Sequence, residues 1–204
     1  MNKFKAHSRG ASIIEFLIVI GILSLVSLGI FDFGRNLFTF STVIRNGLSA
    51  QQDARKLVRT MVTELRTSSI SSSGAYPIYE AATSSIGFFS DIDGDGLKEE
   101  VRYYLSNGFL LKAVRVPSGA PPTYSGSASV STLVVDMRNG TNTPIFSYYD
   151  TNYDGTSAPL SLPINIPAVR LIRITLFVDK DPYRSPIPVS VTTQVSLRNL
   201  KDNL

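Results

Sequence analysis

The stretch RGASIIEFLIVIGILSLVSLGIF, residues 9–31, is a long apolar run with one carboxylate, Glu15, close to its start. The part from Ala11 to Phe31 is long enough to cross a bilayer, since about 20 helical residues span a hydrocarbon core about 30 Å thick. A carboxylate at membrane depth costs at least about 2.5 kcal/mol on insertion scales, so such a residue normally has a partner and a function. If the chain were cut after Gly10, the new amino group of Ala11 would lie one helical turn from Glu15 and become that partner, within one subunit or between neighbours.

A short basic leader precedes the apolar run. It contains Lys3, Lys5 and Arg9 and no acidic residue. Basic residues on this side of a span hold the N-terminus in the cytoplasm. A secretory signal has a shorter apolar region that is followed by its cleavage site, whereas the candidate cut at Gly10 precedes the run. The leader therefore predicts a single-pass membrane protein with a cytoplasmic N-terminus.

These residues resemble the class III leader of type IV prepilins and type II secretion pseudopilins: a basic leader ending in Gly10, a small first mature residue, Ala11, and Glu15 as the fifth mature residue. The resemblance implies that a prepilin peptidase in the bacterial inner membrane cleaves between Gly10 and Ala11 and methylates the Ala11 amine. It also implies that Glu15 guides docking into a periplasmic or extracellular filament. The implied partners are other pilins or pseudopilins, the peptidase and an inner-membrane assembly platform. The alternative is an uncleaved anchor whose glutamate extends to the membrane interface.

The composition excludes several classes of function. The net charge is +4, but three of the 20 basic residues lie in the leader, so the processed chain would be nearly neutral against its 16 acidic residues. Strong nucleic-acid binding is therefore not expected. The chain has no cysteine, and its one histidine, His7, precedes the candidate cut. Cysteine nucleophiles, Ser-His-Asp triads and histidine-ligated metal centres are unavailable to the processed chain, so we expect no enzyme activity.

Beyond Phe31 the run gives way to an amphipathic pattern. Apolar residues recur at helical spacing at positions 50, 54, 57, 58, 61, 62 and 65, while Gln51, Asp53, Arg55, Lys56, Arg59 and Glu64 fill the other face. This pattern predicts one helix that continues to about Thr67, about 85 Å long at 1.5 Å per residue, with its second half packed on a soluble domain. The chain has no proline before Pro77. Major pilins usually have one near the apolar stretch, so this favours the pseudopilin and minor-pilin branches.

After the serine-rich segment 67–74 the pattern changes to that of strands. Two turn sequences, Ser106-Asn107-Gly108 and Asn139-Gly140, predict antiparallel hairpins between successive runs. In the last run, the alternate apolar residues from Val189 to Leu197 should face the helix. The runs are rich in β-branched and aromatic residues and cover 86–89, 101–105, 109–116, 132–137, 145–149, 169–178 and 189–197.

The sequence therefore predicts an α+β fold, in which a long N-terminal helix packs on a mostly antiparallel sheet, as in many pilins. The length allows one membrane helix and one soluble domain of ordinary size. The expected segments are a leader at 1–10, a transmembrane or filament-core helix at 11–32, an amphipathic helix at 33–68 and a β-rich head at 69–204.

An acidic loop is the strongest metal-binding candidate. Residues 91–96 read DIDGDG, which has the carboxylate and glycine spacing that opens a twelve-residue calcium loop. Glu99 would supply the ninth position, but the twelfth is Arg102 rather than glutamate and a strand follows, so a helix-loop-helix EF-hand is not predicted. The alternative is a polar turn that needs no ion. The predicted Ca²⁺ ligands are Asp91, Asp93, Asp95 and Glu99.

Asp150, Asn152 and Asp154 repeat this spacing without an acidic residue soon after them. A turn is the expected role of this second acidic segment, and a metal site is the weaker alternative.

The acidic loop with the following VRYYL, residues 101–105, and the closing VSLRN, residues 195–199, resemble J-type pseudopilins and W-type minor pilins. That resemblance implies a subunit at or near the tip of a pilus or pseudopilus. Three alternatives stay open: a major pilin of an adhesive or motility filament, a competence pilin with a DNA-binding head, which the near-neutral charge disfavours, and an uncleaved, membrane-anchored, calcium-stabilised binding module.

Overall fold

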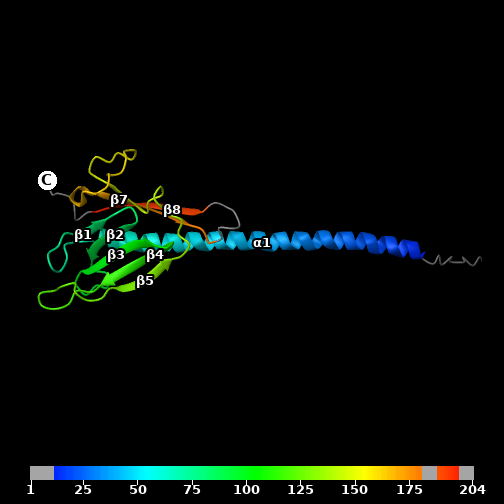
Figure 1. Ribbon diagram of the computed structural model, residues 1–204, viewed down its shortest axis with the longest axis horizontal. Coiled ribbons are helices and arrows are strands. Elements are labelled where there is room, and N and C mark those ends of the chain that lie inside the picture. Colours follow the sequence, from blue (N-terminus) through cyan, green and yellow to red (C-terminus); the bar gives the residue numbers. More distant parts are fainter. Residues whose placement is uncertain (1–11, 181–187, 198–204) are drawn as a thin grey trace, which may run out of the picture. The chain divides into compact units, whose positions relative to one another are not determined.

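The computed structural model describes residues 12–180 and 188–197, so Gly10 and Ala11 lie outside the described residues. One long helix, α1 (Ile13–Arg66), is followed by strands that form two antiparallel sheets (Figure 1). This arrangement confirms the predicted α+β fold. The chain divides into two compact units, residues 1–44 and residues 45–204, which we call the helical unit and the globular unit.

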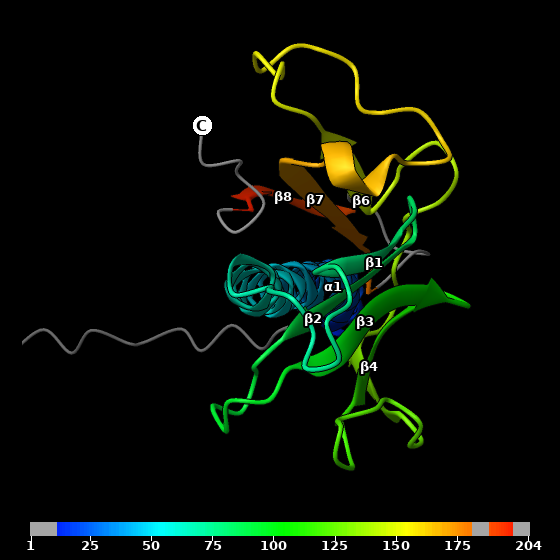
Figure 2. The same cartoon turned by 90° about the vertical axis from the view of Figure 1, so that its left-hand side faces the viewer.

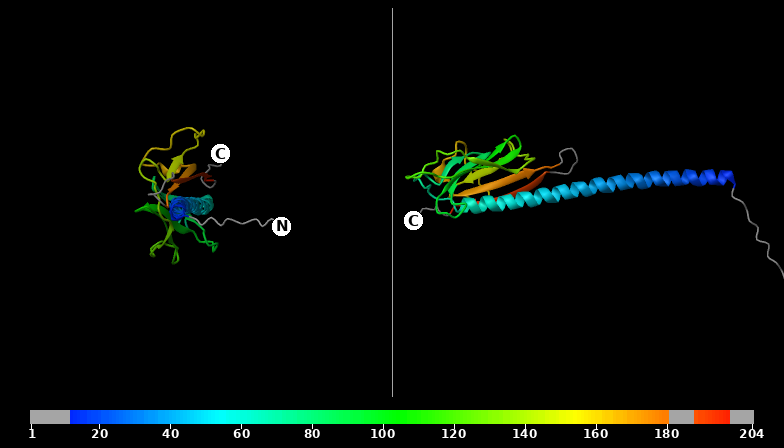
Figure 3. Two further views of the ribbon diagram at one scale, coloured as in Figure 1. Left: turned by 90° about the vertical axis from the view of Figure 1, so that its right-hand side faces the viewer. Right: turned by 90° about the horizontal axis from the view of Figure 1, so that it is seen from below.

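Within the helical unit, α1 runs without interruption through Gly21, Gly29 and Gly34 (Figure 3). Hydroxyl groups along it bond back to the preceding turn, as Ser24 Oγ does to the carbonyl of Ile20 at 2.8 Å. The most apolar window of 18 residues has a mean hydropathy of 2.6, and none of it is buried. By length and composition, this helix can cross a membrane.

Within the globular unit, α1 presents an apolar stripe to the core. The predicted helical spacing is confirmed, because the buried residues of α1 include Ala50, Ala54, Leu57, Val58, Met61 and Leu65. They pack with residues of both sheets in one hydrophobic core. The helix ends at Arg66, close to the predicted position.

Glu64 departs from the prediction that it lies on the polar face. It is only 9% exposed. Its Oε2 accepts a hydrogen bond from the Tyr103 hydroxyl at 2.7 Å, and its Oε1 lies 2.6 Å from Lys112 Nζ. Tyr103 and Lys112 are paired across neighbouring strands, so both reach the same carboxylate. The buried charge is tolerated because it is paired and hydrogen-bonded.

The larger sheet has five strands in sequence order: β1 (Ile78–Ala81), β2 (Ser85–Ser90), β3 (Glu99–Ser106), β4 (Phe109–Arg115) and β5 (Ser129–Val134). Figure 2 labels the first four of them. The hairpin predicted between β3 and β4 is confirmed. Asn107 and Gly108 form its turn, with φ values of 50° and 78°, as a two-residue turn of this hand requires. Strand β1 was not predicted, and its four residues give little periodic signal.

The smaller sheet contains β6 (Phe146–Tyr149), β7 (Leu171–Val178) and β8 (Val189–Ser196), in that order, with a short 3₁₀ helix, η1 (Ile166–Ala168), before β7. Val195 of β8 and the following Leu197 are buried in the core that α1 shares, as the alternation predicts.

The hairpin predicted at Asn139-Gly140 is wrong, because the strands on either side of it, β5 and β6, belong to different sheets. Gly140 instead forms an isolated bridge with Thr143. The Asn139 side chain donates to the carbonyl of Thr175 at 2.9 Å and accepts from the N–H of Phe177 at 2.8 Å. The turn is thus fixed to β7 by side-chain bonds that a local pattern does not reveal.

Backbone bonds join the two sheets in two places. Met137 donates to the carbonyl of Gly108 at 2.9 Å, and Arg138 donates to that of Phe177 at 2.8 Å. At the other place, the carbonyl of Thr83 accepts from the N–H of Phe146 at 3.0 Å. The loops at the ends of the larger sheet are therefore held by the smaller sheet.

Candidate functional site

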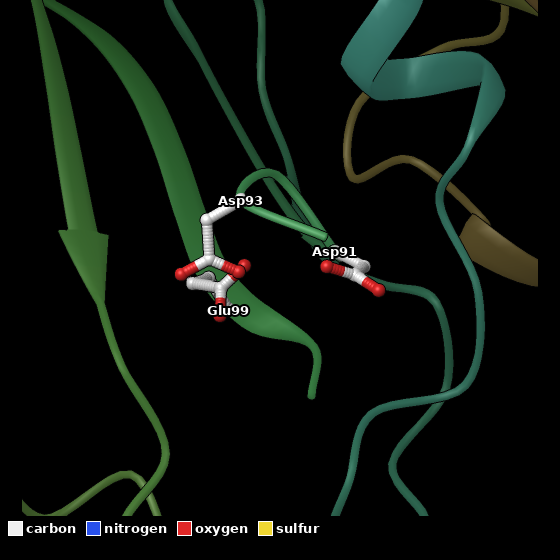
Figure 4. A group of neighbouring side chains, drawn as sticks. All are labelled: Asp91, Asp93 and Glu99. Carbon is white, nitrogen blue, oxygen red and sulfur yellow. The ribbon is translucent and has the colours of Figure 1, made fainter. Parts of the chain in front are cut away.

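The connection between β2 and β3 gathers three carboxylates. Asp91 and Asp93 come from the loop, and Glu99 is the first residue of β3 (Figure 4). One carboxylate oxygen from each lies within 4.8 Å of the other two. The structure therefore brings together three of the four residues that the sequence predicts as Ca²⁺ ligands.

The loop wraps around its own carboxylates. Gly94 and Gly96 have φ values of 83° and 93°, which side chains of other residues rarely allow. Their N–H groups donate to Asp91, Gly94 to Oδ1 at 2.8 Å and Gly96 to Oδ2 at 3.1 Å. The N–H of Asp95 donates to Asp93 Oδ1 at 3.2 Å. The Asp-Gly sequence thus fixes the two loop carboxylates in place.

Glu99 is the buried member of the cluster. It is 1% exposed, and its Oε2 accepts a hydrogen bond from the N–H of Ile92 at 2.9 Å. Its Oε1 is buried and has no hydrogen-bond partner among the residues that the structure describes. Burial, and after it the nearby charges of Asp93 and Asp95, raise the pKa of Glu99 above its ordinary value. A buried acceptor without a partner is uncommon, because leaving it unpaired is costly.

Lys98 provides the loop's own positive charge. Its Nζ lies 3.2 Å from Asp91 Oδ2, so this ion pair involves one of the three carboxylates of the cluster. Asp95 lies outside the group of three, and its Oδ1 accepts from the N–H of Leu97 at 2.7 Å.

Two residues that the sequence did not indicate hold the end of this loop. The N–H of Lys98 donates to Ser72 Oγ at 2.8 Å, and the Tyr124 hydroxyl donates to the Lys98 carbonyl at 2.5 Å. The N–H of Ser72 donates to the same hydroxyl at 3.2 Å. Three connections far apart in sequence therefore meet at Lys98, and no local spacing could have predicted this meeting.

The second acidic segment forms turns instead of a cluster. The N–H of Asn152 donates to Asp150 Oδ1 at 2.9 Å. Asp154 Oδ1 accepts from the N–H groups of Thr156 and Ser157, at 2.9 and 2.8 Å. These bonds lower the pKa of Asp154 to about 2. Among the described residues, the candidate metal cluster is the one at Asp91, Asp93 and Glu99.

Glu15 lies in the first turn of α1, with an exposed side chain. Its N–H donates to the carbonyl of Ser12 at 3.0 Å, which begins the helix. The other predicted processing residues, Gly10 and Ala11, lie outside the described residues. The pairing of Glu15 with the Ala11 amine stays a prediction.

The fold and the helix define a class: an α+β protein with one helix that can cross a membrane. No protein-family model and no curated protein matches this chain. The resemblance of its N-terminal residues to prepilins therefore remains a prediction from the sequence.

Proposed function

We propose that this protein is a minor pilin or pseudopilin subunit. It is cleaved after Gly10, methylated at Ala11 and assembled through α1 into a type IV pilus or a type II secretion pseudopilus. The resemblance to J-type and W-type proteins supports a position at or near the tip. The subunit starts in the bacterial inner membrane with its N-terminus in the cytoplasm.

The observation that carries this proposal is the uncovered apolar surface of the helical unit. Ile13, Phe31 and Phe38 are 82%, 65% and 78% exposed. A soluble protein rarely leaves so large an apolar surface open to water. Lipid covers such a helix in a membrane, and neighbouring helices of the same kind cover it in a filament. One surface therefore serves both storage and assembly.

Glu15 supplies the selective element of this mechanism. Lipid cannot neutralise its carboxylate, whereas the amine of a neighbouring subunit can. Entry of a subunit into the filament then pairs two charges that are each costly alone in the membrane. We infer that this pairing, together with helix packing, favours the filament over the bilayer.

Mass spectrometry of the N-terminus tests the proposal. The membrane-associated protein is isolated from cells with and without the prepilin peptidase. The expected result is a methylated Ala11 in the first strain and an intact leader in the second. A leader that persists in both strains would overturn the proposal and favour an anchored module that does not polymerise.

A substitution at the cleavage site provides the second test. Gly10→Leu should block processing because a bulky side chain occupies the position before the cut, and Ser8→Leu, two residues earlier, is the matched control. Normal processing of the Gly10 variant would contradict the assigned site.

A further inference from the structure

We propose that Asp91, Asp93 and Glu99 form a Ca²⁺ site that fixes the β2–β3 connection to its neighbouring loops. This inference concerns the globular unit alone and does not depend on processing or assembly. The juxtaposition of the three carboxylates is its first basis, and the buried, unpartnered oxygen of Glu99 is the second.

The unpartnered oxygen points to a ligand. Glu99 uses its Oε2 to accept from the N–H of Ile92, which fixes the orientation of the carboxylate. Its Oε1 is buried and accepts no hydrogen bond from any described residue, although Glu99 belongs to the cluster. A cation bound between the carboxylates would satisfy this oxygen and remove the penalty of burying it.

The charges support the same conclusion. Three carboxylates within 4.8 Å repel one another unless a cation lies near them. Lys98 contacts Asp91. Among the described residues, no lysine or arginine forms an ion pair with Asp93 or Glu99. Within the part of the chain that the structure describes, the negative charge of this pair therefore has no paired counter-charge.

The chemistry of the ligands selects the ion. An all-oxygen, carboxylate-rich set suits hard cations such as Ca²⁺ and Mg²⁺ rather than zinc or copper. Mg²⁺ demands near-ideal octahedral geometry and keeps most of its water, whereas Ca²⁺ accepts irregular sets of six to eight oxygens. Loop carboxylates that are already bound by N–H groups from Gly94 and Asp95 form such an irregular set. Water and backbone carbonyls would complete the shell.

Bound Ca²⁺ would act beyond its own loop. Lys98, next to Glu99, is bonded to Ser72 in the segment after α1 and to Tyr124 in the segment between β4 and β5. Fixing Glu99 thus fixes the place where three connections meet. The chain has no cysteine, and a metal clip would supply the cross-link that a disulfide gives other exported domains.

The test uses the full chain purified in detergent and freed of metal with a chelator. All nine tyrosines lie after residue 75 and the chain has no tryptophan, so near-ultraviolet circular dichroism follows unfolding of the globular unit. Calorimetric titration with CaCl₂ should give one site. Ca²⁺ at about 100 times Kd should raise Tm by about 5 °C or more. Absence of binding heat and of a Tm shift would overturn the proposal, as would an equal effect of the same MgCl₂ concentration.

Variants then assign the ligands. Glu99→Gln and Asp93→Asn should each weaken Ca²⁺ binding at least about tenfold, because each removes a charged ligand. Asp154→Asn, in the second acidic segment, is the matched control and should bind like the wild type. Lys98→Met should bind about fivefold more tightly or better, because it removes a competing positive charge. Wild-type affinity in both ligand variants would overturn the assignment.

Metal-free Glu99→Gln should unfold at a Tm no lower than that of the metal-free wild type, because a neutral amide relieves the repulsion. This measurement separates a lost ligand from a lost fold. Should Glu99→Gln fail to fold, the exposed Asp93 decides: weakened binding in Asp93→Asn supports the site and unchanged binding refutes it.

Discussion

The two parts of α1 differ in what covers their apolar side chains. In residues 13–44 the large apolar side chains are exposed, as at Leu25, which is 71% exposed. In residues 45–66 the apolar stripe is covered by strands of the same chain, and Leu65 is fully buried. The second part is completed within the subunit, whereas the first requires lipid or other helices to cover it. The difference teaches that the second part of the helix contributes to the stability of the fold, whereas the proposed storage and assembly would depend on the first part.

Replacing a leucine by alanine should give the largest difference in unfolding free energy between the two parts of α1. Leu65→Ala should destabilise the globular unit by about 2 to 5 kcal/mol, because it leaves a cavity in the core. Leu25→Ala should change that stability by less than about 0.5 kcal/mol. Denaturant unfolding in detergent, followed by the tyrosine signal, measures both. Equal losses would mean that the two parts are not independent.

Glu64 tests the polar contact that the second part makes with the larger sheet. Glu64→Ala should cost about 2 to 3 kcal/mol, because it leaves Lys112 and the Tyr103 hydroxyl without their shared partner. Glu64→Gln keeps hydrogen bonds but loses the charge, so it should lose less. Thermal unfolding of both variants beside the wild type checks this order. A glutamine variant as unstable as the alanine variant would show that the charge alone matters.

Glu15 tests the first part. Glu15→Gln should be cleaved and methylated normally, yet enter filaments at least about tenfold less, because the proposed charge pair with a neighbouring Ala11 amine would lose its carboxylate. Stability of the globular unit should not change. Asp32→Asn, which neutralises the other acid of the helical unit, is the matched control. Sheared filaments analysed by quantitative mass spectrometry give the ratio of incorporation, and equal incorporation of both variants would contradict the role of Glu15.

Elements with a strong local signal were predictable. The helix follows from an apolar run and an unbroken 3.6-residue period, and the β3–β4 turn follows from Asn107-Gly108, where both residues adopt positive φ. Three of the four residues that the acidic spacing selected, Asp91, Asp93 and Glu99, lie together in the structure, and metal binding by them stays a prediction.

Features that depend on distant residues were not predictable. The local pattern assigns Glu64 to the polar face of the helix, because its partners Tyr103 and Lys112 lie far away in the sequence. The local pattern likewise predicts a hairpin turn at Asn139, whereas the structure shows its side chain bonded to β7. The burial of Glu99, which leaves one of its oxygens without a hydrogen bond among the described residues, likewise has no local signal. In each case tertiary contacts, with no trace in the local pattern, decided the outcome.

The smallest expected change in stability concerns a partly exposed ion pair, Glu80 with Arg102. It serves as the reference for the buried ion pair of Glu64 with Lys112. Glu80 accepts two hydrogen bonds from Arg102, at 2.6 and 2.8 Å, across β1 and β3. These bonds lower the pKa of Glu80 below its ordinary value of 4.5. The Arg102 and Glu80 side chains are 42% and 27% exposed, so solvent screening limits the contribution of the pair to about 1 kcal/mol or less.

A lowered pKa in the folded state sets the direction of the pH effect. The contribution of Glu80 is complete above pH 4.5 and is lost as pH falls through the lower, folded-state pKa, where the carboxylate takes up its proton. Glu80→Gln should therefore be slightly less stable than the wild type at pH 7, and the difference should shrink as the pH is lowered below 4.5. Thermal unfolding of the two proteins over this range, without added metal, measures the difference. A gap that widens on acidification would show that Glu80 is not stabilised as an anion.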